Sequence, residues 1–309
     1  MKKTIYTGTY TGTGSEGIYR FTFEDGKLTE PSLFCKMKNP KYLSLKDGVL
    51  AAVADFPHGA GVSIVDESGN IMDTKVFEKN TSCYVGQTEQ YVLTANYHEG
   101  SFSILTKEEN KLKLVHHTLV FDGGGCHQVL VWNDLFLVPS LFLDRIVIYN
   151  QECKYVDSIR FDSGCGPRHG IFSKDKEYLY LVSELSNELF VIHCGDWKIV
   201  NHISVLPNEE KHVRGGAAIR MNEEGNRIYI STRGKDVISV IDVNQEKLSL
   251  VQVVSCGGKH PRDFILCDGY LLCANRNTNE VVSFELHEDG TVGKIVDRIS
   301  IQEPVSLVY

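Results

Sequence analysis

Five residues with side chains suited to catalysis or anion binding stand at comparable points of a recurring sequence pattern. They are His127 in GCHQVL, Arg168 in GPRH, Glu184 in SEL, Arg233 in STRG and Arg262 in HPRD. A glutamate or a histidine can take a proton from water or from a substrate. An arginine cannot act as a base, but it offers a fixed fork of donors to a carboxylate, a phosphate or an oxyanion. Together these residues predict acid–base chemistry on an anionic substrate.

We divide the candidates into a catalytic group and a substrate-binding group. The residues expected to be catalytic are Glu184, His127 and Arg168. The residues expected to bind the substrate are Arg233, Arg262, His169, Asn96 and Asn275.

Several of these residues also have a purely structural explanation. Arg168 and Arg262 follow a proline at the start of a strand and can pair with acidic neighbours such as Asp263. The structural alternative for Glu184 is that it forms a salt bridge with Arg168 and has no part in catalysis. Side chains alternate along a regular strand, so His169 is expected on the side opposite Arg168, where it would pack beside the site. The site hypothesis therefore depends on the elements that position these residues.

Those elements are short β-strands that recur along the whole chain, without a convincing amphipathic helix between them. One strand appears seven times, beginning at Gly17, Gly61, Ser101, Arg145, Glu188, Val237 and Val281. The starts lie 40 to 49 residues apart, a period typical of four-stranded propeller blades. We therefore predict an all-β, seven-bladed β-propeller with four-stranded antiparallel blades, formed as one domain by residues 1–309.

Two further strands precede this one in each repeat. Six innermost strands are expected within PKYLSL, CYVGQ, CHQVLV, PRHGIF, GAAIRM and PRDFIL. The seventh, PVSLVY, stands at residues 304–309, while the N-terminus begins directly with the second strand, TIYTGT. We predict that the C-terminal strand completes the first blade and so pairs an otherwise open sheet edge. In a closed ring, the ends of equivalent strands converge on one mouth of the central channel.

Composition and charge exclude several functional classes. The 309 residues carry a formal net charge of −8, which argues against non-specific binding to nucleic acid or to an anionic membrane. No segment has the pattern of a signal peptide, and no apolar run approaches the roughly 18 residues that span a bilayer. Nine irregularly spaced cysteines are expected to stay reduced. We expect a cytoplasmic protein, of an oligomeric state that the sequence does not indicate.

Three cysteines recur beside glycines in the loops that enter three blades: Cys126, Cys165 and Cys256. Thiols gathered at one rim can bind a metal or form a redox pair. No CxxC pair or HExxH motif supports a metal, and small side chains suit crowded turns. We therefore expect no metal and no cofactor.

Several blocks of the sequence resemble the seven-bladed lactonase family, which includes propeller-type bacterial 6-phosphogluconolactonases and fungal carboxymuconate-lactonising enzymes. These blocks are YTGTYTGTGSEGIYRF, GPRHGIF with SELSN, STRGKDVISV and HPRDFILCDGYLLCANRNTNEVVSF. The resemblance covers essentially the whole chain. Two departures concern the substrate more than the fold: Ser183 stands where the family commonly has Asn, and an acidic residue common near Ala218 is missing.

The resemblance implies a metal-free lactonase at the channel mouth, most specifically one that hydrolyses 6-phosphoglucono-δ-lactone. Either Glu184 or His127 would be the general base, and the arginines would hold the anionic group and the developing oxyanion. A phosphorylated sugar lactone and a polycarboxylate both fit three arginines. Two alternatives remain open: a carboxymuconate cycloisomerase-like enzyme or a lactonase for another anionic substrate, and a non-catalytic propeller that serves as an interaction platform.

Overall fold

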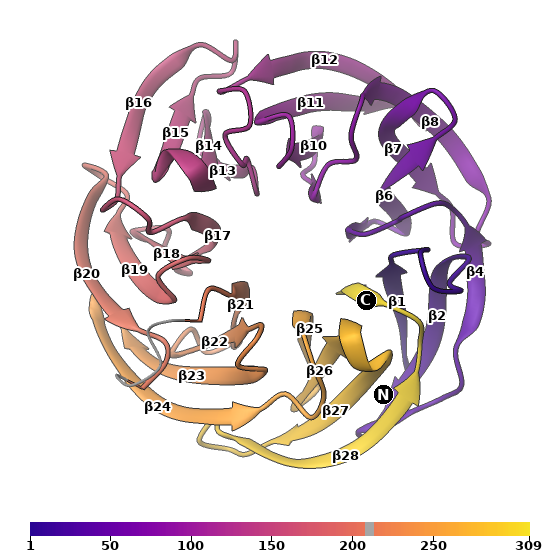
Figure 1. Cartoon of the computed structure of the whole chain (residues 1–309), viewed down its shortest axis with the longest axis vertical. Helices are drawn as coiled ribbons and strands as arrows, with labels where there is room; N and C mark the ends of the chain where they lie inside the picture. The colour runs from indigo at the N-terminus through magenta and orange to yellow at the C-terminus, as the bar shows by residue number, and fades with distance from the viewer. Residues whose placement is uncertain (208–212) are drawn as a thin grey trace.

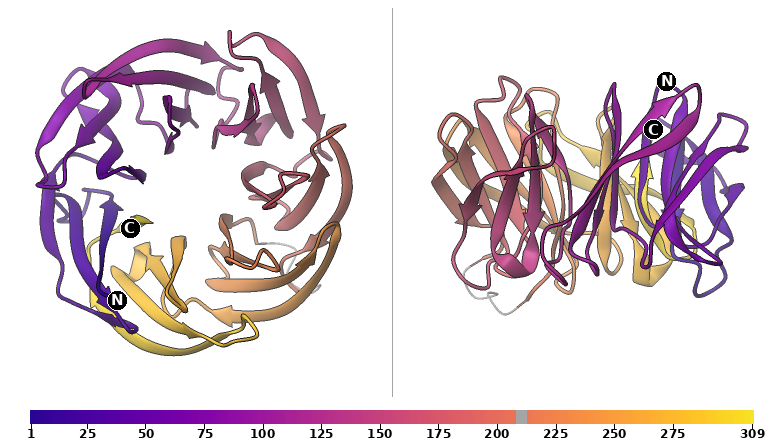
Figure 2. Two further views of the ribbon diagram at one scale, coloured as in Figure 1. Left: turned by 180° about the vertical axis from the view of Figure 1, so that it is seen from behind. Right: turned by 90° about the horizontal axis from the view of Figure 1, so that it is seen from above.

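The described residues, 1–207 and 213–309, form seven antiparallel sheets arranged as blades around a central axis (Figure 1). The structure is a computed structural model. The side view in Figure 2 shows a short cylinder, with the two termini close together at one end. The seven-bladed propeller predicted from the repeat is confirmed. None of the helices in these two stretches is long and apolar enough to cross a membrane.

Each blade is a meander that runs from the axis to the rim. The innermost strands are β29 (Pro304–Val308), β5 (Leu43–Lys46), β9 (Tyr84–Gln87), β13 (Leu130–Trp132), β17 (Pro167–Phe172), β21 (Gly216–Met221) and β25 (Pro261–Cys267). The second strands are β1 (Lys3–Thr9), β6 (Val49–Phe56), β10 (Tyr91–Asn96), β14 (Leu135–Ser140), β18 (Tyr178–Ser183), β22 (Arg227–Thr232) and β26 (Tyr270–Asn275).

The outer half of each blade follows the same order. The third strands are β2 (Gly17–Glu24), β7 (Gly59–Val65), β11 (Ser101–Glu108), β15 (Arg145–Tyr149), β19 (Glu188–His193), β23 (Val237–Asn244) and β27 (Glu280–Leu286). The rim strands are β3 (Lys27–Leu28) with β4 (Ser32–Lys36), β8 (Ile71–Glu78), β12 (Lys111–Leu119), β16 (Tyr155–Arg160), β20 (Lys198–Ser204), β24 (Lys247–Ser255) and β28 (Val292–Ser300). Two single-turn 3₁₀ helices, η1 (Leu141–Leu143) and η3 (Arg276–Thr278), each follow a second strand.

The apolar core lies between neighbouring blades. The second and third strands are buried along most of their length, whereas the rim strands alternate between exposed and half-buried residues. One cluster joins Val182 and Val191 of one blade to Ile228 and Ile241 of the next. Because each blade buries both of its faces against its neighbours, the ring must close for the terminal blades to be covered.

Closure is achieved by the two ends of the chain, as the sequence predicted. The C-terminal strand β29 pairs antiparallel with β1, and Leu307 lies opposite Thr7. Leu307 is buried in a cluster with Ile5 and Phe21 of the first blade and Leu272 of the last blade. This strand therefore both completes a sheet and fills the seam between the first and last blades.

We predict that Leu307→Ala lowers the free energy of unfolding by about 2–5 kcal/mol, because it leaves a cavity at this seam. Urea unfolding at neutral pH measures the change. A Leu33→Ala variant serves as the control, because Leu33 is an exposed leucine of the same blade. Equal losses in the two variants would show that the closing strand does not stabilise the ring.

Candidate active site

A polar pocket of about 200 Å³ opens where the inner strands meet around the axis. Its lining comes from all seven blades and consists of Tyr10, Lys41, Cys83, Tyr97, His98, His127, Glu184, Arg233 and Arg262. Four of the eight site residues predicted from the sequence are in this lining, and Arg168 lies directly behind Glu184. Segments more than 130 residues apart in the chain are thus brought to one place.

The carboxylate of Glu184 is the centre of an ion cluster in this pocket. Its Oε2 accepts a hydrogen bond from Nε of Arg168 at 2.7 Å, and Nη2 of Arg233 lies 2.8 Å from the same oxygen. The Arg168 side chain is 2% exposed and that of Glu184 is 17% exposed. Charge-assisted bonds of this kind are strong in a site with little water. The pair Arg168–Glu184 expected from the sequence is present, extended by Arg233.

A local irregularity of β17 directs Arg168 into the channel. Pro167 pairs with Ser183 and His169 pairs with Val182, so Arg168 is the extra residue of a β-bulge. Its Nη1 donates to the backbone oxygen of Ala217, in the next inner strand. A bulge interrupts the alternation of side chains. Arg168 and His169 consequently both face the channel, whereas a regular strand would have separated them.

Glycines allow the sixth blade to approach this cluster closely. A Cβ atom at Gly216 would collide with the backbone oxygen of Ser183, the residue before Glu184. The Arg233 side chain is also held by its own blade, because its Nε and Nη2 donate to the backbone oxygens of Gly215 and Gly216 at 3.2 and 3.3 Å. The guanidinium of Arg233 is therefore fixed between its own blade and the carboxylate.

The rings of His127 and His169 pack edge to face, with their centres 4.9 Å apart, and are joined by hydrogen bonds. Nε2 of His169 lies 3.1 Å from the backbone oxygen of His127 and 3.1 Å from its Nδ1. A carbonyl oxygen only accepts, so the proton of His169 lies on Nε2. Nδ1 of His127 then accepts, and its proton lies on Nε2, which is 3.9 Å from Oε2 of Glu184. His127 therefore presents a donor to the pocket, and His169 acts from behind it.

Burial and charge set the protonation states of these groups. Burial, followed by the positive charge of Arg168, holds the pKa of His127 and of His169 well below the usual value, so both rings are neutral. Burial acts to raise the pKa of Glu184, but the charges of Arg168 and Arg233 outweigh it and hold the pKa below its usual value. The pocket at neutral pH thus contains an ionised carboxylate and a neutral imidazole.

Arg262 is part of the lining, and its charge also acts to lower the pKa of Glu184, but it forms no ion pair with that carboxylate. Its guanidinium lies 5.9 Å from the centre of the Tyr10 ring, on the side of the first blade. In the part of the chain that the structure describes, it forms no ion pair with a carboxylate.

Five lining residues were not predicted from the sequence: Lys41, Tyr97, His98, Tyr10 and Cys83. A signal for Lys41 was present, because Pro40–Lys41 opens the predicted inner-strand segment PKYLSL just as Pro167–Arg168 opens PRHGIF and Pro261–Arg262 opens PRDFIL. The equivalence of these three dipeptides was visible in the repeat. The aromatic residues Tyr10 and Tyr97 carried no comparable signal, because each follows a strand end whose register only the structure defines.

Asn96 and Asn275 are not brought to the pocket. Asn275 pairs with Pro261 as Ser183 pairs with Pro167, so it stands one residue before the position that Glu184 occupies. Both asparagines are fully buried, and each donates to a backbone oxygen, Asn96 to that of Asn80 and Asn275 to that of Cys256. They tie loops to the blades. The position equivalent to Glu184 is occupied by Tyr97, which lines the pocket, and by Arg276, which pairs with Glu303.

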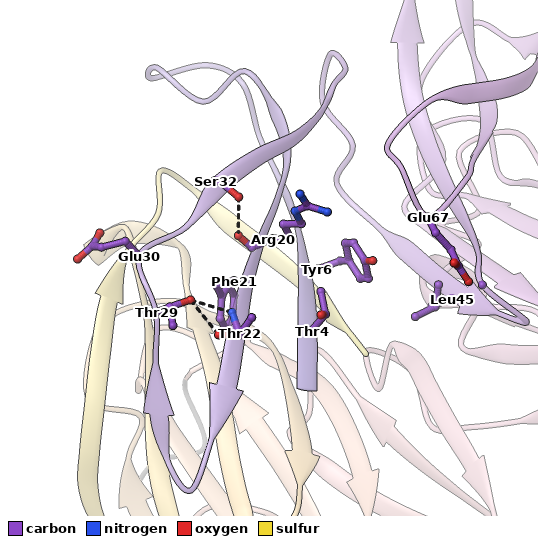
Figure 3. Close-up of a pocket in the computed structure, with 11 residues that line it drawn as sticks. Thr4, Tyr6, Arg20, Phe21, Thr22, Thr29, Glu30, Ser32, Leu45 and Glu67 are labelled. Carbon is purple, nitrogen blue, oxygen red and sulfur yellow. Dashed lines mark hydrogen bonds between the residues drawn. The ribbon is translucent and has the colours of Figure 1, made fainter. Parts of the chain in front are cut away.

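A larger hollow of about 620 Å³ lies between the first two blades, away from the axial pocket (Figure 3). It is lined by charges of both signs, such as Arg20, Glu30 and Glu67. Its hydroxyl groups bond to neighbouring groups of the first blade, as the dashed lines of Figure 3 show for Thr29 and Ser32. The hollow lacks the convergent, buried polar groups of the axial pocket.

The cysteines that recur in the loops are buried free thiols. Burial raises the pKa of Cys126 and of Cys165 to about 12, which disfavours the reactive thiolate. Across residues 1–207 and 213–309, no three His, Cys, Asp or Glu side chains are grouped as metal ligands.

Comparison with known proteins relates the whole ring to lactonases. A family described as "Lactonase, 7-bladed beta-propeller" matches residues 4–309. A 6-phosphogluconolactonase of Bacillus subtilis is 29% identical, over 98% of this chain and 97% of its own. A crystal structure of a protein from Lactobacillus plantarum superposes with a TM-score of 0.92 at 25% identity, covering 99% of both chains. A putative 6-phosphogluconolactonase from Bacteroides fragilis gives 0.88 at 25% identity, covering 99% of this chain and 97% of that one.

We predict that stability falls as the pH is lowered below about 6.5, because unfolding lets the two buried histidines take up protons. Each histidine contributes a slope of at most about 1.4 kcal/mol per pH unit. His169→Gln keeps a donor for the His127 carbonyl and removes one titrating group, so its slope is smaller. Urea unfolding at pH 7, 6 and 5 measures both slopes.

A His116→Gln variant, on the rim strand β12, controls for the loss of a histidine outside the channel. Parent and His169→Gln proteins with the same slope would contradict the neutral, buried state of His169.

Proposed function

Because the chain belongs to the seven-bladed β-propeller lactonase family, we propose that it hydrolyses a sugar-acid lactone at the axial pocket and that the substrate is 6-phosphoglucono-δ-lactone. The product is 6-phosphogluconate. The named activity of the Bacillus subtilis relative, which aligns along nearly the full length of both chains, supports this substrate.

The observation that carries the proposal is the charge of the pocket. Lys41, Arg233 and Arg262 line it, Arg168 stands behind it, and Glu184 is the one carboxylate among the lining residues. This local excess of positive charge stands in a protein of net charge −8. A cleft lined by one sign of charge attracts a ligand of the opposite sign. The pocket thus suits an anion that must also meet a base.

Glu184 is the proposed general base. It is ionised, and it is the one carboxylate in the pocket lining, whereas the proton of His127 on Nε2 makes that ring a donor towards the pocket. A water beside Glu184 attacks the lactone carbonyl carbon and gives its proton to the carboxylate. The ring C–O bond then breaks, and the leaving alkoxide takes the proton from Glu184. The sum is one lactone and one water converted to one hydroxy acid.

The oxyanion of the tetrahedral intermediate needs donors that are already in place. Nε2–H of His127 and the guanidinium of Arg233 flank Glu184 from two sides and supply them. One aimed donor typically stabilises such a transition state by about 3 kcal/mol. Arg168 does not need to reach the substrate: it fixes Glu184 and is itself held by the Ala217 carbonyl.

The position of the unusual residues favours catalysis over an interaction platform. Buried, charged and perturbed groups collect in one concave site, as is typical of enzymes. A polycarboxylate such as a muconate would meet the same cations, so a panel of substrates must include muconates as well as lactones.

We predict that the purified protein accelerates hydrolysis of freshly made 6-phosphoglucono-δ-lactone over the spontaneous rate, and that Glu184→Gln lowers kcat about 10²–10⁴-fold. Glu184→Asp keeps the charge that balances Arg168, so it should fold and still lose activity by displacing the carboxylate. Acid release in weakly buffered solution follows the reaction.

Glu280→Gln is the matched control, because Glu280 pairs with Arg298 at 2.9 Å on β27, outside the pocket. It should retain the parent rate. A folded Glu184→Gln protein as fast as the parent would remove Glu184 from the mechanism. A parent protein that turns over muconates and no lactone would replace the proposed function with the cycloisomerase alternative.

A further inference from the structure

The cations of the pocket fall into two groups. Arg168 and Arg233 are committed to Glu184 and to backbone oxygens. Lys41 and Arg262 also line the pocket, but across the described stretches neither forms an ion pair with a carboxylate. Both charges nevertheless act on the same buried group, the thiol of Cys83. Burial raises the pKa of this thiol, and the charges of Lys41 and Arg262 partly oppose that increase. Two half-buried, uncompensated cations therefore face one small cavity.

We propose that Lys41 and Arg262 form a phosphate subsite on the far side of the pocket from Glu184, and that Lys41 makes the enzyme select phosphorylated over unphosphorylated lactones. This inference rests on the proposed lactonase function and adds the orientation of the substrate and a specificity-determining residue.

The blade order separates this subsite from the base. Strand β29 contacts β25 on one side and β5 on the other, so Arg262 and Lys41 flank the first blade. The sheet that contains β17 and β18 lies across the ring from β1 and β2 (Figure 1). A substrate whose anionic end meets Lys41 and Arg262 therefore extends its other end towards Glu184 and His127.

The first blade holds the two cations in place. A Cβ atom at Gly8 would collide with the backbone oxygen of Pro40, so the missing side chain lets β1 approach the segment that carries Lys41, just before β5. On the other side, the Tyr10 ring packs against Arg262. Arg276 contacts the same ring at 4.2 Å, but Glu303 neutralises it at 2.8 Å. Unlike Arg276, Lys41 and Arg262 have no carboxylate partner among the described residues, so both can bind an anionic ligand.

The number and type of these cations favour phosphate over a single carboxylate. A phosphate monoester carries about −1.5 to −2 charges at neutral pH and three acceptor oxygens. Two cations match that charge, and the ammonium of Lys41 with the fork of Arg262 supplies donors to several oxygens. A carboxylate would leave one of the two half-buried cations without a partner. The cavity of about 200 Å³ is comparable to a six-carbon lactone with its phosphate.

The test compares two lactones, glucono-δ-lactone and 6-phosphoglucono-δ-lactone, in the parent, Lys41→Met and Lys41→Arg proteins. Lys41→Met should raise KM for the phosphorylated lactone about tenfold or more, the effect expected when a hydrogen bond to a charged group is lost. Its kcat, and both constants for glucono-δ-lactone, should change less than about threefold. Lys41→Arg should restore most of the selectivity. Lys38→Met, which removes an exposed lysine just before the strand, is the matched control and should behave as the parent.

Inorganic phosphate provides a readout that does not need turnover. It should raise the melting temperature of the parent and of Lys38→Met with increasing concentration, and that effect should weaken in Lys41→Met. If the parent hydrolyses both lactones and Lys41→Met leaves their KM ratio and the phosphate effect unchanged, the subsite is overturned while the lactonase function stands. A parent that prefers the unphosphorylated lactone also overturns the subsite. A parent that binds phosphate through Lys41 but hydrolyses neither lactone overturns the proposed function and leaves the subsite.

Discussion

One shared carboxylate organises the pocket: Oε2 of Glu184 is held by Arg168 and Arg233 at once. Burying the charged guanidinium of Arg168 costs desolvation free energy, and only a close ion pair with further hydrogen bonds offsets that cost. The carboxylate and the Ala217 carbonyl provide this compensation, and in return they fix the guanidinium. The cluster therefore joins the fifth and sixth blades at the axis. It also leaves an ionised acceptor facing the pocket, which is the state a base requires.

The propeller serves this cluster by repetition. Every blade begins an inner strand at the same mouth of the channel, so one position in the repeat becomes a ring of side chains around the axis. Chain closure through β29 completes that ring between the blades of Lys41 and Arg262. Different side chains on equivalent positions divide the ring into an arc with the proposed base and an arc with unpaired cations. Function thus arises from substitutions on a symmetric scaffold, and the scaffold alone does not determine it.

The sequence was sufficient for the blade count, the closing strand and the convergence of His127, Glu184, Arg233 and Arg262, because period and strand pattern are global properties of the repeat. The sequence did not show the strand register to within one residue. The bulge at Arg168 brings His169 into the channel, although regular alternation predicted the opposite side. Asn96 and Asn275 were assigned to the site because the strand ends were predicted one residue too early. In the structure, the pairing of β26 with β25 buries Asn275 in its blade. Regular alternation does not show where a bulge lies, and the bulged Arg168 is held by a contact with the sixth blade that is distant in sequence.

The most direct test of the whole account is a crystal structure with the proposed product, 6-phosphogluconate, bound. We expect the phosphate between Lys41 and Arg262, and the new carboxylate beside Nε2 of His127, Arg233 and Glu184. A product bound in the reverse direction would contradict the assignment of the two arcs. A product bound away from the axis would contradict the assignment of the pocket itself.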